Sequence, residues 1–358
     1  MKNICFLVGN LNNAGGIERV TSVVANALAT KGYNVFILNL IDGKNPFFEL
    51  NPNIKIDCIF SKPVSFKTHY LTTIFAIRSF IVKYKINTLI VADSISCIFT
   101  VAALIGIKKV KHICWEHFNY DYNLGLKLRD LGRKLAAKYC DIIVTLTNED
   151  KLLWEKSLTS LEAKIVTIAN PTPFENIVNT PSLKHKTVLA VGRLTYQKGF
   201  DRLLEAWAKI NINNKHWTLK IVGNGEDKDK LISQAKNLNI ENSVQFISNT
   251  HSISQYYSSC SMICMSSRFE GLPMVLIEAI SFGLPIVSFN CKCGPSDLIE
   301  HNGNGYLVDN GDISQLAEAL DTMINASPED YDKFIKKSYE LSLKYYIDSL
   351  IKQWIEII

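Results

Sequence analysis

Long apolar segments are missing from this chain of 358 residues. The most apolar stretch, residues 95–107, is interrupted by Ser96, Cys97 and Thr100 and is shorter than the ~18 residues that cross a bilayer. The apolar run near the N-terminus, residues 4–8, gives way at once to polar residues. We therefore expect no membrane-spanning helix and no signal peptide, and we predict that the chain begins with a buried strand.

Several catalytic motifs are also missing. The sequence has no G-x-x-x-x-G-K-[ST] loop, no G-x-S-x-G elbow and no recognition-helix signature for DNA. The D-x-D sequence nearest to a strand end, residues 227–229, falls in the predicted first turn of a helix and is interpreted as solvated. These absences argue against a P-loop nucleotidase and an α/β-hydrolase, and they leave no evident metal–carboxylate site.

The nine cysteines include no C-x-x-C pair, and most of them lie in apolar strands. An odd number of buried thiols is typical of a reduced, cytoplasmic protein. Cys291 and Cys293 remain open as a metal or redox pair, although plain loop thiols are the favoured interpretation because no second Cys/His pair is near them in sequence.

Charge is divided unevenly along the chain. Residues 1–171 carry 21 Lys and Arg against 13 Asp and Glu, a net charge of +8, whereas residues 172–358 carry 18 against 21, a net charge of −3. The basic half therefore predicts an anionic partner. Nucleic acid, a phospholipid surface and a phosphorylated substrate all satisfy this observation alone.

Buried strands alternate with amphipathic helices in two successive stretches, which predicts two doubly wound α/β domains with parallel sheets. The first domain spans residues 1–171, a linker rich in proline spans 172–186, and the second domain spans 187–339. The predicted strands lie near 3–9, 34–40, 54–60, 88–93, 111–115, 141–147, 164–168, 187–191, 217–222, 243–247, 262–266, 285–289 and 305–308. Helices are expected at 17–30, 312–325 and 328–357.

Candidate ligand-binding residues follow the strands, where parallel sheets bind ligands. Gly15 and Gly16 open the first helix, and a helix N-terminus with flanking glycines can hold a phosphate. A simple turn explains the same glycines equally well. Arg193 and Lys198 follow the first strand of the second domain and offer two cations for a diphosphate, although solvated surface cations are the commoner outcome.

The segment from Ser267 to Ala279 carries the strongest pattern. A strand enters a loop containing Gly271 and Leu272, and Pro273 suits the first position of a helix whose amides would form another phosphate cradle. Glu270 and Glu278 are eight residues apart, and both can face one cleft and accept hydrogen bonds from sugar hydroxyls. The alternatives are a solvated helix residue for Glu278 and stabilisation of the helix dipole for Glu270.

Two further features belong to the basic half. His117 follows a predicted strand and suits general-base work or hydrogen bonding to a reacting sugar, with a structural role as the alternative. A helix predicted over 124–139 has an apolar stripe flanked by lysines, which suits an anionic membrane or, equally, an ordinary core-facing helix. The stripe comprises Leu124, Leu128, Leu131, Leu135 and Tyr139, and the lysines are Lys127, Lys134 and Lys138.

Together these motifs resemble the retaining glycosyltransferases of family 4, which have the GT-B architecture. The resemblance rests on GGIERV, GRLTYQKGFDRLLEAW, SSRFEGLPMVLIEAISFGLPIVS and CGPSDLIEHNGNGYLV, which occur in the family's order over nearly the whole chain. Enzymes that build O-antigen or capsule are the most similar group. The resemblance implies two Rossmann-like domains facing each other across a cleft, with a C-terminal helix, about 340–358, that packs back on the first domain.

The resemblance also implies roles for the candidate residues. Gly15 and Gly16 lie near the donor diphosphate, which Arg193 and Lys198 bind. Glu270 holds donor-sugar hydroxyls and Glu278 holds the ribose, while the amides of Gly271 and Leu272 meet the diphosphate or the sugar. His117 corresponds to the family's active-site histidine, a match that its varied surroundings make less firm than the others.

By this resemblance the chain is a hexosyl- or N-acetylhexosaminyltransferase that uses a UDP-sugar without a metal or other cofactor. The basic first half and the helix over 124–139 predict that the acceptor is a lipid-linked saccharide and that the enzyme is peripheral on the cytoplasmic face of the bacterial inner membrane. Two alternatives stay open: a phosphorylase or sucrose-type GT-B enzyme with a soluble acceptor, and a silent nucleotide- or glycan-binding subunit. Nucleic-acid binding is disfavoured because the basic half lacks aromatic platforms.

Overall fold

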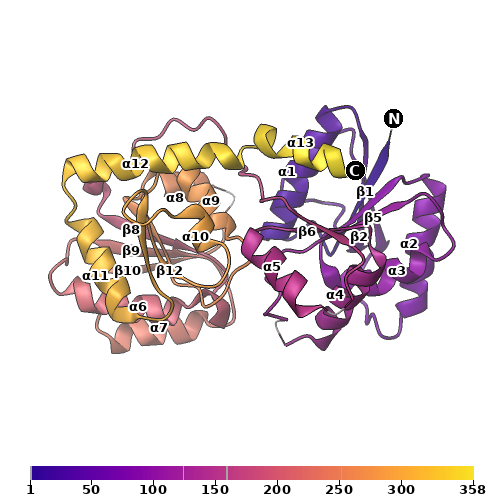
Figure 1. Ribbon diagram of the computed structural model, residues 1–358. Coiled ribbons are helices and arrows are strands. Elements are labelled where there is room, and N and C mark those ends of the chain that lie inside the picture. Colours follow the sequence, from indigo (N-terminus) through magenta and orange to yellow (C-terminus); the bar gives the residue numbers. More distant parts are fainter. Residues whose placement is uncertain (1, 124, 159, 251) are drawn as a thin grey trace. The chain divides into compact units, whose positions relative to one another are not determined.

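The computed structural model describes residues 2–123, 125–158, 160–250 and 252–358 (Figure 1). The chain divides into two compact units: the first comprises Met1–Pro173 together with Tyr346–Ile358, and the second comprises Phe174–Tyr345. Each is an α/β unit built on a parallel sheet, so the predicted fold class is confirmed. Within the described residues, every helix is too short or too polar to cross a bilayer.

The first unit contains a seven-stranded parallel sheet in the order β3-β2-β1-β4-β5-β6-β7. Its central strands are apolar and buried on both faces, as expected for a sheet covered by helices on each side. The strands are β1 (Asn3–Val8), β2 (Asn34–Ile41), β3 (Lys55–Phe60), β4 (Thr88–Val91), β5 (Lys111–Trp115), β6 (Ile142–Thr145) and β7 (Lys164–Thr167). The helices are α1 (Gly16–Thr30), α2 (Tyr70–Lys83), η1 (Ser94–Ser96), α3 (Cys97–Leu104), α4 (Lys127–Tyr139), α5 (Asn148–Ser157) and α13 (Ile347–Ile357).

The second unit contains a six-stranded parallel sheet in the order β10-β9-β8-β11-β12-β13. Its strands are β8 (Thr187–Val191), β9 (Thr218–Val222), β10 (Val244–Ile247), β11 (Met262–Met265), β12 (Ile286–Asn290) and β13 (Gly305–Asp309). Its helices are η2 (Leu183–His185), η3 (Tyr196–Lys198), α6 (Phe200–Asn211), α7 (Lys228–Asn237), α8 (Ile253–Ser258), α9 (Met274–Ser281), α10 (Pro295–Leu298), α11 (Ile313–Ile324), α12 (Pro328–Ser342) and η4 (Leu343–Tyr345). Each of the predicted strands therefore has a counterpart within a residue or two of its expected ends.

The C-terminal segment is not the single helix that the sequence predicts over 328–357. The helix stops at Ser342, and Tyr346 adopts an extended conformation before α13 begins. Residues up to Tyr345 belong to the second unit and those after it to the first. Helix α13 (yellow in Figure 1) packs against α1, and the buried ring of Trp354 lies 4.7 Å from that of Trp115.

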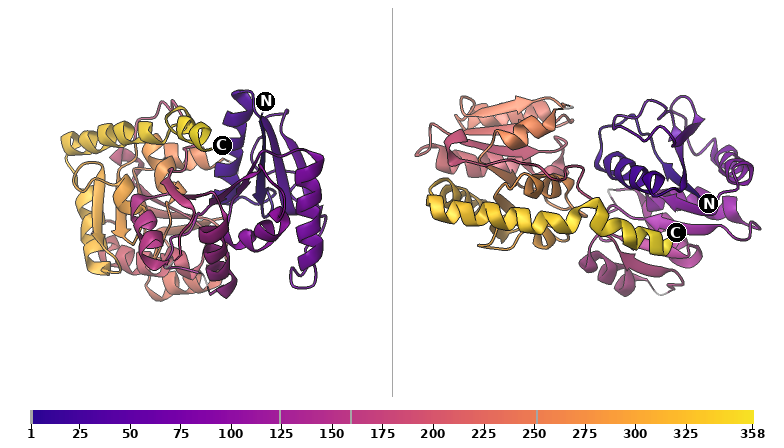
Figure 2. Two further views of the ribbon diagram at one scale, coloured as in Figure 1. Left: turned by 45° about the vertical axis from the view of Figure 1, so that its right-hand side comes forward. Right: turned by 90° about the horizontal axis from the view of Figure 1, so that it is seen from above.

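Figure 2 shows the same C-terminal run of helices from two further directions. The last residue also contacts the start of the chain, because the Lys2 ammonium donates to the carbonyl oxygen of Ile358 at 2.8 Å. The two ends of the sequence thus complete one unit.

Candidate functional site

The carboxyl edge of the second sheet gathers most of the predicted site residues. Strands β8 and β11 are neighbours, so the loops that follow them lie side by side. The Lys198 ammonium contacts Oε1 of Glu270 at 2.6 Å, and the Ser267 hydroxyl donates to the same oxygen at 2.6 Å. Glu270 is 7% exposed, so its carboxylate is held in a fixed position at the edge of the sheet.

The two loops are also joined through their backbones. Gly199 has a left-handed backbone (φ +63°), and a Cβ there would lie 2.2 Å from the carbonyl oxygen of Ser266. The amide of Arg268 donates to the carbonyl of Gln197 at 2.8 Å, and the Ser266 hydroxyl donates to the carbonyl of Lys198 at 3.0 Å. Only glycine permits this approach, which brings Lys198 within reach of Glu270.

Glu278 lies in the second turn of α9 and is 5% exposed, so it is not the solvated helix residue that the sequence left open. The hydroxyl of Tyr257, at the end of α8, donates to its Oε2 at 2.7 Å. A buried carboxylate with a phenolic donor is held at one rotamer, which suits a group that binds a ligand hydroxyl.

The loop before α9 carries Gly271 and Leu272. The predicted position of Pro273 is off by one: it is the extended N-cap residue, and α9 begins at Met274. Gly294 (φ +94°) packs so closely on this loop that a Cβ would lie 2.5 Å from the ring of Pro273 and 2.8 Å from the carbonyl of Gly271. The loop after β12 therefore packs against the residues that precede α9 and holds the start of that helix in place.

Arg193 is exposed and follows Gly192 at the end of β8. The next strand end packs onto this turn, because a Cβ on Gly223 would lie 1.9 Å from the carbonyl of Gly192 and one on Gly225 would lie 2.2 Å from that of Leu194. Three strand ends thus form one tightly packed rim. Asp227 lies beyond it, at the N-cap of α7, with its carboxylate 3.2 Å from Lys230.

In the first unit, Gly15 is the N-cap of α1 and Gly16 is its first residue. The preceding loop is fixed by the Asn12 side chain, which donates to Asp42 and accepts from the amide of Asn45, each at 2.9 Å. Gly15 has an ordinary extended backbone, so its conformation alone does not require glycine. The carboxylate of Glu18 lies over this helix N-terminus, because a Cβ on Gly15 would be 2.1 Å from its Oε2. The site therefore already has one anionic group, and the role of Gly15 and Gly16 in phosphate binding stays a prediction.

His117 follows β5 and is 9% exposed. Burial, opposed by Glu116 and reinforced by Arg129, lowers its pKa to about 4, so the imidazole is neutral near pH 7. Its ring lies 4.5 Å from that of Trp115, and its Nε2 has no hydrogen-bond partner among the described residues. A neutral, fixed imidazole with an open nitrogen can donate to or accept from a bound hydroxyl.

Glu116 orients His117, and no motif in the sequence pointed to Glu116. Its Oε1 accepts from the amides of His117 and Phe118 at 3.0 and 3.1 Å. Its Oε2 accepts from the Ser94 hydroxyl at 2.6 Å and from Nε of Arg133 at 3.0 Å. Burial alone would raise the pKa of Glu116, but the charges of Arg133 and Arg129 bring it below its ordinary value.

Helix α4 supplies both arginines and is oriented in an unexpected way. It begins at Lys127 and not at residue 124, which lies outside the described residues. Its buried face consists of Arg129, Gly132, Arg133, Ala136 and Ala137. A Cβ on Gly132 would lie 2.3 Å from the carbonyl of Ser94, so glycine allows the helix to press against η1.

The leucine stripe of α4 consequently faces outward. Leu128, Leu131 and Tyr139 are 51%, 45% and 53% exposed, and Leu135 is half-buried. Lys127, Lys134 and Lys138 are exposed on the same helix. The alternative in which this stripe packs into the core is therefore wrong, because the buried side chains of Arg129 and Arg133, both paired with Glu116, take the core-facing side.

Family models match both units: residues 14–175 match "Glycosyltransferase Family 4" and residues 174–341 match "Glycosyl transferases group 1". An uncharacterized glycosyltransferase of Haemophilus influenzae is 41% identical, with 99% of each chain covered. The chain belongs to this glycosyltransferase family. It is therefore a transferase, and the resemblance inferred from its motifs is confirmed.

Other relatives have more specific names. The amylovoran biosynthesis glycosyltransferase AmsD of Erwinia amylovora is 32% identical over the whole of both chains. An α-1,4-N-acetyl-D-galactosaminyltransferase of Campylobacter jejuni, whose named substrate is a saccharide on PP-undecaprenol, is 29% identical and covers 100% of this chain and 98% of its own. A TarM variant of S. aureus in complex with fondaparinux, α-GlcNAc-glycerol and UDP superposes with a TM-score of 0.85 at 17% identity, with 100% and 99% of the chains covered, which establishes the GT-B fold.

Proposed function

We propose that this glycosyltransferase retains anomeric configuration and transfers a hexose or N-acetylhexosamine from a UDP-sugar to a lipid-linked saccharide in bacterial surface-polysaccharide synthesis. The observation that carries the proposal is the pair of fixed carboxylates, Glu270 and Glu278, at the rim of the second sheet. The second unit would bind the donor and the first unit the acceptor. The names of the Erwinia and Campylobacter relatives support the surface-polysaccharide assignment.

The donor diphosphate would meet positive charge from two directions. Arg193 is exposed after β8, and Lys198 lies at the same rim, while the amides of Gly271 and Leu272 precede the N-terminus of α9. Cations and free amides stabilise the charge that develops on a departing nucleoside diphosphate. Glu278, held by Tyr257, would accept from the ribose, and the UDP in the TarM complex supports this choice of nucleotide.

Glu270 would position the donor sugar and not attack it. Its Oε1 is already engaged by both Lys198 and Ser267, which lowers its value as a nucleophile. The acceptor hydroxyl would form the new bond to the anomeric carbon on the face from which the diphosphate departs. Its proton would pass to a β-phosphate oxygen, and His117 would hydrogen-bond to the reacting sugar. Detection of a covalent glycosyl–Glu270 adduct by mass spectrometry would refute this mechanism.

The first experiment is thermal unfolding with UDP, GDP, ADP and their sugars. A nucleotide at about 100 times its Kd should add about 2.7 kcal/mol of apparent stability, and we expect this shift with UDP. Glu278→Gln should abolish the shift, whereas Glu318→Gln, an exposed control on α11, should keep it. Stabilisation by sugar phosphates in place of nucleotides would instead identify a phosphorylase-type enzyme.

The exposed stripe of α4 supports membrane association. Leucines flanked by lysines lower the free energy of a helix at an anionic lipid surface. This would place the enzyme on the cytoplasmic face of the inner membrane, beside a lipid-linked acceptor such as the one named for the Campylobacter relative.

Flotation with phosphatidylglycerol liposomes tests this part. Replacing Lys127, Lys134 and Lys138 by Gln should release the protein, as should replacing Leu128 and Leu131 by Ser. A control with three exposed lysines of the second unit changed to Gln, namely Lys215, Lys230 and Lys236, should still float. Equal flotation of all variants would remove the membrane assignment.

A further inference from the structure

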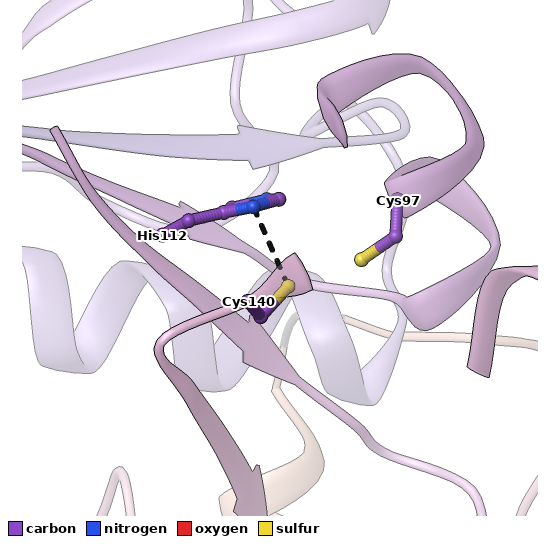
Figure 3. A group of neighbouring side chains, drawn as sticks. All are labelled: Cys97, His112 and Cys140. Carbon is purple, nitrogen blue, oxygen red and sulfur yellow. Dashed lines mark hydrogen bonds between the residues drawn. The ribbon is translucent and has the colours of Figure 1, made fainter. Parts of the chain in front are cut away.

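A group of soft metal-ligand atoms lies inside the first unit, apart from the candidate site. Cys97 is the first residue of α3, His112 lies in β5, and Cys140 directly follows α4. All three side chains are buried, and their ligand atoms lie within 4.8 Å of one another. Figure 3 shows both thiols and the imidazole directed toward a common space.

The imidazole is already oriented as a metal ligand would be. The Thr100 hydroxyl donates to the carbonyl of Ser96 at 3.4 Å, which leaves its oxygen able to accept a hydrogen bond from Nε2–H of His112 at 3.0 Å. The unprotonated Nδ1 then faces Sγ of Cys140 at 3.4 Å. A metal-binding histidine usually donates its other nitrogen to a fixed oxygen in this way, which sets the tautomer.

A fourth donor is adjacent. Cys114 is two residues beyond His112 on the same face of β5, and its thiol shares a hydrogen bond with that of Cys97. Three cysteines and one histidine form a known donor set of closed, four-coordinate zinc sites. With Cys97 and Cys140 as thiolates and a neutral imidazole, the charge of a divalent cation is cancelled, so these three ligands would leave no isolated buried charge. Binding of Cys114 as a third thiolate would give the centre a net charge of −1.

We propose that Cys97, His112 and Cys140 bind a zinc ion, with Cys114 as the nearest candidate for the fourth position. Each coordinating thiol transfers its proton to water as its sulfur–zinc bond forms, and the start of α3 stabilises the thiolate of Cys97. The enclosed position implies that the ion is taken up while the chain folds. The ion would link the start of α3, strand β5 and the end of α4. Helix α4 also carries the two arginines that pair with Glu116.

The test uses the full-length chain produced with added zinc and purified with a reductant but without chelators. Elemental analysis should find about one zinc ion per chain. Replacing Cys97 and Cys140 together by Ala should remove it. Cys5→Ala, a buried thiol in the same sheet that is not in the group, should retain it.

A second measurement does not depend on how the variants fold. The wild-type chain refolded with Co²⁺ in place of zinc should show the thiolate-to-cobalt absorption and the visible bands of a tetrahedral site. Folded wild-type protein without zinc and without these bands would overturn the proposal, as would a Cys97–Cys140 disulfide found by mass spectrometry. Unchanged zinc in the double variant would place the ion elsewhere. None of these outcomes bears on nucleotide binding, so the proposal and the proposed function fail independently.

Discussion

Both sheets hold carboxylate side chains at their carboxyl edges, but the groups that hold them differ between the two units. In the first unit, one enclosed carboxylate, Glu116, is paired with two buried arginines and fixes a backbone turn. In the second unit, Glu270 and Glu278 are held by hydroxyls and one partly exposed lysine, and glycines bring the surrounding backbones together.

This difference predicts that the first edge serves mainly the stability of the fold and the second edge mainly the binding of a ligand. Charges that satisfy one another in the interior contribute to a rigid frame, and breaking them leaves an uncompensated buried charge. A carboxylate held by hydroxyls and a partly exposed lysine contributes less to this frame, and we expect it to contribute more to ligand recognition. Substitutions at the first edge should therefore act mainly on the free energy of unfolding, and those at the second edge on affinity and rate.

The largest expected effect is at Arg133. Arg133→Met leaves Glu116 with a weakened ion pair in a fully buried position, and the chain should lose about 3–5 kcal/mol of unfolding free energy in urea. The double variant Glu116→Gln/Arg133→Met should lose less than the two single variants combined. Additive losses would show that the two side chains are not coupled.

His117 provides a pH-dependent test of the same edge. Its pKa in the folded chain, about 4, is below the ordinary 6.5, so the stability it contributes is present above pH 6.5 and is lost as the pH falls toward 4. The expected loss is about 3 kcal/mol. Asp150 acts in the opposite direction, because burial raises its pKa to about 7 and favours the folded state at lower pH.

The informative quantity is therefore the difference between the wild type and His117→Gln, measured by urea unfolding from pH 4 to pH 8. That difference should vary with pH between 6.5 and 4 and be flat above. A difference that is constant over the whole range would mean that His117 is protonated equally in both states.

At the second edge, Glu270→Gln should lower kcat/KM about 100-fold, the cost of weakening hydrogen bonds to a charged acceptor. The unfolding free energy should change by less than about 1 kcal/mol, because Lys198 reaches solvent. If this variant instead unfolds the protein while keeping its rate when folded, the contrast between the two edges is wrong.

The smallest predicted effect is at Tyr257. Tyr257→Phe removes the phenolic donor to Glu278 and should weaken UDP binding about tenfold in calorimetry, with little change in kcat. A fall in kcat at unchanged affinity would assign Glu278 to the reaction and not to the nucleotide.

Sequence reasoning located the strands well, because strands buried on both faces appear as short, continuous apolar runs. It failed at α4, where an apolar stripe normally faces the core. There the acidic partners of Arg129 and Arg133 lie far away in sequence, at Asp93 and Glu116, and Gly132 allows the helix to approach η1 closely. The thiol group was invisible for the same reason, since Cys97, His112 and Cys140 have no local spacing in common.

The candidate carboxylates were found because they lie in one continuous segment with their glycines. The residues that hold the functional side chains in place were not found. Tyr257 belongs to a different helix from Glu278, and the sequence pointed to His117 and not to its neighbour Glu116. A single sequence shows which side chains carry charge, but the hydroxyl or amide that fixes each one is set by packing between distant elements.

Helix α13 has a consequence for the order of events during synthesis. The first unit contains residues from both ends of the chain, so its last helix leaves the ribosome only after the entire second unit. At typical elongation rates the intervening residues take roughly 9–34 s. During that interval Trp115 lacks the ring of Trp354, and the nascent first unit presents an unfilled apolar surface to chaperones. A stop codon that removes only the final dozen residues would make that transient state permanent.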